Sequence, residues 1–316
     1  MTQKRKPDII LGNYWSDNDH FADLYNAVLF DGKPVLLPGD LEELDSNVSQ
    51  IFEHKEFVQN ILAHRDVVKI VKHSQKHDIN LAILGIENQD RIHYAMPLRV
   101  MEYDTLSYMK QYHENAKNYP SEQGLTKDEY LSKMKQTDKF VPVITLVIYY
   151  GEKEWDGAKS LKEMLTISPE MQQYVNDYHM HLVEIKNGNL KLNNQHNKDL
   201  FKICNMFYDH TESLAQRKKR VTDYATQNCV ERNVLNTAGA IVEKEITITE
   251  KEGENMCSFF EELEAQCRQE GQLQKACDIV RNVMEKLGLS LEAACELAEI
   301  TVENYKEYEL AQSSVS

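Results

Sequence analysis

The order of apolar and polar residues predicts alternating helices and strands in the first half of the chain. Residues 16–30 keep apolar side chains at helical spacing behind polar residues that suit a helix cap. Two apolar runs, 64–71 and 79–89, flank the polar stretch KHSQKHD, which is typical of a turn between two strands. Between the first helix and this hairpin, residues 40–45 predict a helix of one or two turns.

The alternation continues beyond the hairpin. A helix is expected over 96–118, and the run FVPVITLVIYYG at 140–151 is dense in the Val, Ile and Tyr that strands favour. Short helical stretches follow, and then another strand at 180–185. This order predicts an α/β domain over about 1–210 with a helical tail.

The sequence predicts that the last third of the chain is helical. Residues 196–236 have helical periodicity, and the composition shifts near 245–256. Two further segments, 257–288 and 290–309, predict a helical hairpin in which Gly288 ends one helix and Ser290 caps the next.

Charge separates the main domain from this tail. The net charge is −15, and residues 241–316 contain 17 Asp or Glu against 7 Lys or Arg, so this region carries −10 and leaves −5 for residues 1–240. We therefore place the boundary after residue 240, with a charged helical excursion near 111–138 inside the first domain. Because the acidity lies mainly in the tail, the main domain remains compatible with a nucleic-acid ligand.

The composition predicts a soluble cytoplasmic protein with no membrane partner. No apolar run approaches the roughly 20 residues that a spanning helix needs. The basic start, MTQKRKPDII, is not followed by the apolar segment of a signal peptide. None of the six cysteines forms a CxxC pair, which favours reduced thiols over disulfides or a zinc site.

The hairpin brings two carboxylates together if its register is regular. Placing Asp66 opposite Glu87 puts the hairpin centre between Lys76 and His77, inside the polar turn. Adjacent carboxylates repel each other unless a cation lies between them. Oxygen ligands that leave positions for water and phosphate suit Mg²⁺, so the pattern predicts a metal site at this end of the hairpin.

The residues after Glu87 add to this site. Side chains alternate between the two faces of a strand, so Gln89 shares the face of Glu87 and Asn88 points the opposite way. We expect Gln89 to orient an attacking water, and the backbone carbonyl of Asn88 to serve as a further metal ligand.

An Asp followed after 20 residues by Glu-x-Gln at the end of an apolar strand resembles the PD-(D/E)XK nuclease superfamily, with Gln where Lys is usual. More narrowly, the chain is similar to the Rpn family of recombination-promoting nucleases and transposase-like proteins. The C-terminal GLSLEAACELAEITVENY is similar to the helical tail of that family. The other supporting stretches, in order, are SDNDHFADLYN, DLEELD, RDVVK, LGIENQ, YAMPLRVMEYDTLSY and FVPVITLVIYYGEKEWDG.

The resemblance implies a restriction-endonuclease-like core, a central mixed sheet flanked by helices, that cleaves DNA in recombination or mobile elements. It makes Asp66 and Glu87 ligands of Mg²⁺, with Mn²⁺ as a substitute. Gln89 takes the place of the third active-site residue, and Asp23, or alternatively Asp17, is the acid on the first core helix. Without a Lys at 89, no ammonium is available to activate water or stabilise the leaving group.

Two further groups of residues have alternative interpretations. Arg99 and Tyr103 are four residues apart on the helix expected over 96–118, so they share a face and can contact a phosphate or brace Glu87. The basic QRKKR at 216–220 is either a phosphate contact or a solvated helix face. His179 and His181 have strand spacing, but no third metal ligand lies near them in the sequence.

The main alternative function is a catalytically weak or inactive module that keeps the nuclease fold and binds DNA or protein. The Gln at position 89 and the net acidity favour this alternative, and RNA as a substrate also stays open. The apolar face of the tail predicts self-association or a partner helix. Its residues are Val280, Val283, Met284, Leu287, Leu291, Cys295 and Leu297.

Overall fold

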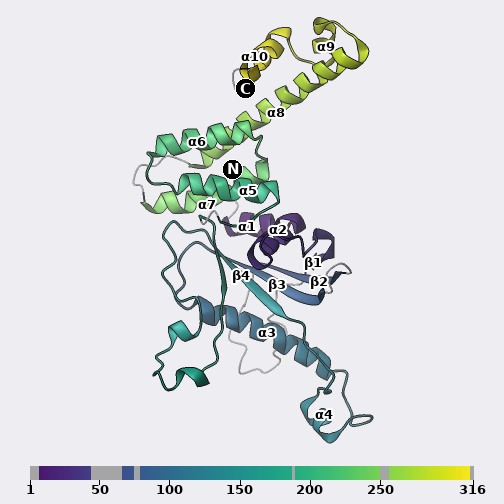
Figure 1. The fold of residues 1–316 in the computed structure, drawn as a ribbon, viewed down its shortest axis with the longest axis vertical. Coiled ribbons are helices and arrows are strands. Elements are labelled where there is room, and N and C mark those ends of the chain that lie inside the picture. Colours follow the sequence, from purple (N-terminus) through teal and green to yellow (C-terminus); the bar gives the residue numbers. More distant parts are fainter. Residues whose placement is uncertain (1–6, 44–65, 75–78, 187–188, 250–255, 314–316) are drawn as a thin grey trace, which may run out of the picture.

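A five-stranded sheet lies at the centre of the molecule, with helices on both of its faces (Figure 1). The structure is a computed structural model that describes residues 7–43, 66–74, 79–186, 189–249 and 256–313. The strands are β1 (Leu41–Glu43), β2 (Val67–Ser74), β3 (Ile79–Gln89), β4 (Val143–Tyr149) and β5 (His181–Glu184).

In the chain, helices lie before the first strand, between strands and after the last strand. Those before β5 are α1 (Pro7–Ser16), α2 (Asn18–Leu29), α3 (Met96–Ala116) and α4 (Lys127–Ser132). Those after it are α5 (Gln195–Phe207), α6 (Leu214–Gln227), α7 (Arg232–Thr249), α8 (Met256–Leu287), α9 (Leu291–Leu297) and α10 (Val302–Ser313).

The sheet is mixed, with the strands in the order β1-β2-β3-β4-β5. The β1–β2 and β2–β3 pairs are antiparallel, whereas β3–β4 and β4–β5 are parallel. Most of β4 is buried, which accounts for its nearly continuous apolar sequence. The predicted α/β class, with a mixed sheet, flanking helices and a helical C-terminal region, is therefore confirmed. Its nuclease-like character stays a prediction.

The two faces of the sheet carry different helices. On one face, alternate residues of β3 such as Leu84 and Ile86 belong to a large core with α1, α2 and α5–α8. On the other face, Met96 and Val100 of α3 pack against Val147 of β4. Figure 1 shows α3 on the side of the sheet opposite α1 and α2. Successive residues of β3 therefore face different environments.

Some predicted elements differ from the structure. The helix expected at 40–45 is replaced by β1, which begins at Leu41 and pairs with β2. The helical stretch expected at 196–236 is divided into α5, α6 and the start of α7. The break between α5 and α6 ends in a capping box formed by Ser213 and Gln216. The break between α6 and α7 contains Cys229, whose φ is 48°. The predicted boundary after residue 240 falls inside α7.

The tail extends from the body along α8 and carries α9 and α10 at its far end (Figure 1). Gly288, with a φ of 63°, follows α8, and Ser290 caps α9, as predicted. The apolar face predicted to meet a partner is largely used inside the tail, where Val280 and Cys295 are buried together. Three other residues of this face remain exposed: Met284 by 36%, Leu287 by 67% and Leu297 by 61%. Self-association through this face stays a prediction.

One tyrosine connects the helical layer to the sheet. Tyr25 of α2 is fully buried, and its hydroxyl lies 2.7 Å from the carbonyl oxygen of Gly85 and 3.0 Å from that of Ile144. These carbonyls belong to neighbouring strands, β3 and β4. Tyr25 therefore fixes α2 over the β3–β4 pair.

We predict that Tyr25→Phe lowers the free energy of unfolding by about 1–2 kcal/mol, because buried carbonyls lose their hydrogen-bond donor. Urea unfolding followed by circular dichroism measures this difference. Tyr174→Phe is the matched control, since Tyr174 is 73% exposed. Equal stabilities of the two variants would contradict this role of Tyr25.

Candidate functional site

The pairing of Asp66 with Glu87 stays a prediction, because the described register of the β2–β3 hairpin ends one position short of it. Val67 pairs with Ile86, and the pairing continues to Ser74 and Ile79. One position beyond Val67, the backbone N–H of Asp66 donates to the carbonyl of Ile86 at 3.1 Å. The hairpin centre between residues 76 and 77 that follows from this register lies outside the described residues.

A backbone hydrogen bond fixes Asp66 at the strand end. The N–H of Asn88 donates to Oδ2 of Asp66 at 2.7 Å. Asp66 itself is exposed, whereas Glu87 is only 2% exposed. The two carboxylates thus differ in exposure: that of Asp66, just before β2, faces solvent, and that of Glu87 on β3 is buried.

Glu87 is held by two side-chain groups on its own face of the sheet. Nη2 of Arg99 forms an ion pair with Oε1 of Glu87 at 2.7 Å. Nε2 of Gln89 donates to the same oxygen at 3.1 Å, and also to the carbonyl of Asn88 at 2.9 Å. Gln89 therefore orients Glu87 in this structure, rather than presenting its N–H groups to solvent.

Arg99 is itself oriented by Tyr103, one turn further along α3. Nε of Arg99 donates to the hydroxyl of Tyr103, so the guanidinium connects this hydroxyl to Glu87. Burial acts to lower the pKa of Arg99, but Glu87, Tyr103 and Asp66 outweigh it and the pKa is raised. Burial, together with the charge of Glu87, raises the pKa of Tyr103. Both side chains therefore keep their protons at neutral pH.

Asp104, to which no role was assigned from the sequence, anchors the helix that carries Arg99. Its buried carboxylate accepts hydrogen bonds from the hydroxyl of Thr145 on β4, at 2.7 Å, and from the hydroxyl of Tyr178. An acidic residue four positions after Val100, on the apolar face of the helix, is the signal that could have identified it.

The donor set at the hairpin end suits a hard divalent cation. It combines the carboxylates of Asp66 and Glu87 with the carbonyl of Asn88, all oxygen ligands of the kind that Mg²⁺ takes together with water. Across the residues that the structure describes, no group of three or more His, Cys, Asp or Glu side chains is placed to bind a metal. A cation here would therefore rely on two carboxylates.

Asp23 lies away from this pair. The core packing of α2 is on the face of the sheet opposite Glu87. Oδ1 of Asp23 accepts from the backbone N–H groups of Asn193 and Asn194, at 2.7 and 3.0 Å, and Oδ2 accepts from Nδ2 of Asn197 at 2.9 Å. These contacts fix the start of α5. Asp17, the alternative acid, caps the N-terminus of α2.

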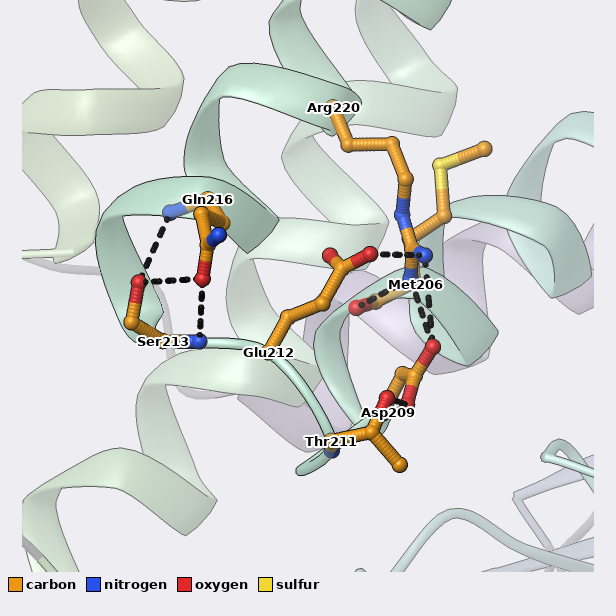
Figure 2. Close-up of polar contacts among 7 residues, drawn as sticks. All are labelled: Met206, Asp209, Thr211, Glu212, Ser213, Gln216 and Arg220. Carbon is orange, nitrogen blue, oxygen red and sulfur yellow. Dashed lines mark hydrogen bonds and ion pairs between the residues drawn. The ribbon is translucent and has the colours of Figure 1, made fainter.

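The basic cluster at 216–220 makes contacts within the protein. Arg217 is buried, and its Nη1 donates to the carbonyl of Phe207. Arg220 forms ion pairs with Asp209 at 3.2 Å and with Glu212 at 2.9 Å (Figure 2). These two arginines connect α6 to the end of α5, so they are engaged in the protein rather than presented to a phosphate.

The two histidines considered as metal ligands make no shared site. His179 lies 3.2 Å from Asp177, and His181 is exposed at the start of β5.

Comparisons of this chain with protein-family models, with curated proteins and with solved structures gave no match. The resemblance to the Rpn family therefore stays a prediction from the sequence. The described part of the chain also has no helix that is long and apolar enough to cross a membrane. Support for a function comes from the geometry around Asp66 and Glu87.

We predict that Asp23→Ala lowers the free energy of unfolding by roughly 2–4 kcal/mol, because it removes a charged acceptor from the buried start of α5. Chemical denaturation measures the change, and Asp19→Ala, an exposed substitution on the same helix, is the control. Equal stability of the two variants would show that the Asp23 contacts contribute nothing to folding.

We also predict that Asp209 stabilises the protein in a pH-dependent way. Hydrogen bonds from Thr211, and then from Arg220, lower the pKa of Asp209 in the folded state. A lowered pKa stabilises the fold fully above the ordinary carboxyl pKa, and this contribution is lost as the pH falls through the lowered pKa.

Asp209→Asn should therefore be less stable than wild type at pH 7, and the difference should shrink as the pH falls below about 4. Thermal unfolding between pH 2.5 and 7 tests this dependence. Asp223→Asn, an exposed change on α6, is the control. A difference that stays constant over this range would refute the prediction.

Proposed function

We propose that the Asp66–Glu87 end of the hairpin is the metal-binding site of a DNA endonuclease that hydrolyses phosphodiester bonds. The observation that carries this proposal is the 2.7 Å hydrogen bond from the N–H of Asn88 to Oδ2 of Asp66, which holds the Asp66 carboxylate against the residue that follows Glu87. The Rpn resemblance, including the link to recombination or mobile elements, adds support that is independent of the coordinates.

A bound Mg²⁺ or Mn²⁺ supplies Lewis-acid stabilisation of a phosphate and lowers the pKa of a bound water. Asp66 and Glu87 hold the cation, and the carbonyl of Asn88 completes the protein ligands. Gln89 keeps Glu87 in orientation through its 3.1 Å hydrogen bond. Arg99 contributes positive charge from a side chain that is 34% exposed, in a site that has no Lys at position 89.

A second candidate is a non-cleaving module that binds DNA or protein with the same fold. The observation that favours it is the engagement of Oε1 of Glu87 by both Arg99 and Gln89. Oε1 with these two partners is satisfied without a metal, and a Gln at position 89 adds no cation for catalysis. This candidate keeps DNA as a partner without hydrolysis.

We predict that the purified protein nicks supercoiled plasmid in Mg²⁺ or Mn²⁺ and that EDTA abolishes the nicking. Asp66→Asn and Glu87→Gln should each lower the rate by at least about 100-fold, because each removes a charged metal ligand at little change in size. Glu154→Gln, an exposed change outside the site, is the matched control. A parallel assay on single-stranded and duplex RNA shows whether the protein cleaves RNA as well as DNA.

The outcomes distinguish the two candidates. A wild-type protein that binds Mn²⁺ or DNA without nicking supports the non-cleaving module. Nicking that survives both substitutions would assign the activity to another site or to a contaminant, and would refute the proposed function.

A further inference from the structure

Glu87 already has a cation in this structure. The guanidinium of Arg99 approaches Oε1 at 2.7 Å, and the Glu87 side chain is 3% exposed. A buried carboxylate is costly without a compensating positive charge, so this ion pair compensates the burial of Glu87. The ion pair occupies Oε1 of the carboxylate that the proposed metal site requires.

The charges of the site do not favour Arg99 and a metal on the same carboxylate. Asp66 and Glu87 together carry −2 when ionised, and Arg99 carries +1. A divalent cation would raise the positive charge to +3, with the guanidinium and the metal close to each other at Glu87. The guanidinium and the metal would repel each other if both contacted Glu87, most strongly where water is excluded.

Arg99 has a contact other than Glu87 and is partly open to solvent. Its side chain is 34% exposed, and its Nε is bonded to the hydroxyl of Tyr103 rather than to a carboxylate. The contact with Tyr103 does not involve Nη2, the atom that approaches Glu87. Arg99 can therefore leave Glu87 without losing every partner.

We propose that Arg99 is the resident cation of the metal-free site, and that its guanidinium and a divalent metal compete for Glu87. This inference rests on the proposed function, because it assigns a role to Arg99 at the same metal site. Arg99 is then a positioning residue that sets metal affinity. A purely structural ion pair would leave metal affinity unchanged.

The test measures Mn²⁺ binding to the full chain without DNA, by calorimetry and by electron paramagnetic resonance. Arg99→Met should bind Mn²⁺ about tenfold or more tightly than wild type, because the competing charge is gone. Its metal-free form should melt at a lower temperature, and Mn²⁺ should raise that temperature more than it does for wild type. Arg91→Met, an exposed change between β3 and α3, is the matched control and should bind like wild type.

Two further variants keep the test decisive. Arg99→Lys retains the charge but not the fork that reaches both Glu87 and Tyr103, so its affinity should lie between those of wild type and Arg99→Met. It also replaces Arg99→Met if that variant fails to fold. Adding Glu87→Gln to either variant should abolish Mn²⁺ binding, which locates the metal.

The outcomes separate this inference from the proposed function. Equal or weaker Mn²⁺ binding by Arg99→Met, still dependent on Glu87, would overturn the competition and leave the metal site standing. An equal gain in Arg91→Met would mean a general charge effect and would also overturn it. No Glu87-dependent binding in any variant would overturn both the inference and the proposed metal site.

Discussion

The antiparallel register of β2 and β3 is the constraint on which the site depends. Because strand side chains alternate, a slip of one residue in β3 would send Glu87 into the core beside α1 and α2 and turn Ile86 toward α3. The observed register buries Leu84 and Ile86 among apolar residues and leaves Glu87 on the face of α3. The hydrophobic pattern of the strand therefore places the carboxylate, since only this register keeps the apolar residues in the core.

The burial of Glu87 in turn makes the site depend on α3. A carboxylate that is 2% exposed needs a cation, and Arg99 supplies it from a helix that Asp104 anchors to β4 through Thr145. The negative charge of the strand end and the positive charge of the helix thus come from segments joined by a short connection. The same proximity that stabilises Glu87 is the basis of our proposal that Arg99 competes with a metal for this carboxylate.

Local patterns in the sequence were sufficient for most of the sheet. The polar turn between two apolar runs defined the hairpin, and simple pairing about its centre predicted the register that brings Val67 opposite Ile86. The helix predicted over 96–118 is α3, and Gly288 and Ser290 end and begin helices as expected. These features depend on periodicity, turn chemistry and capping, which act over a few residues and so can be read along the chain.

The partners of the polar side chains were decided by the tertiary structure. Asp23 stabilises the start of α5, about 170 residues further along the chain, and Arg220 is paired with acids at the end of α5 rather than exposed. The sequence left open whether Arg99 meets a phosphate or braces Glu87, and the fold places it on Glu87. The sequence by itself determined which strand residues share a face. Only the packing of α2, α3 and α5 decided which charged side chains contact each other. These contacts join residues far apart in the chain, and the spacing of apolar residues within one helix or strand does not predict them.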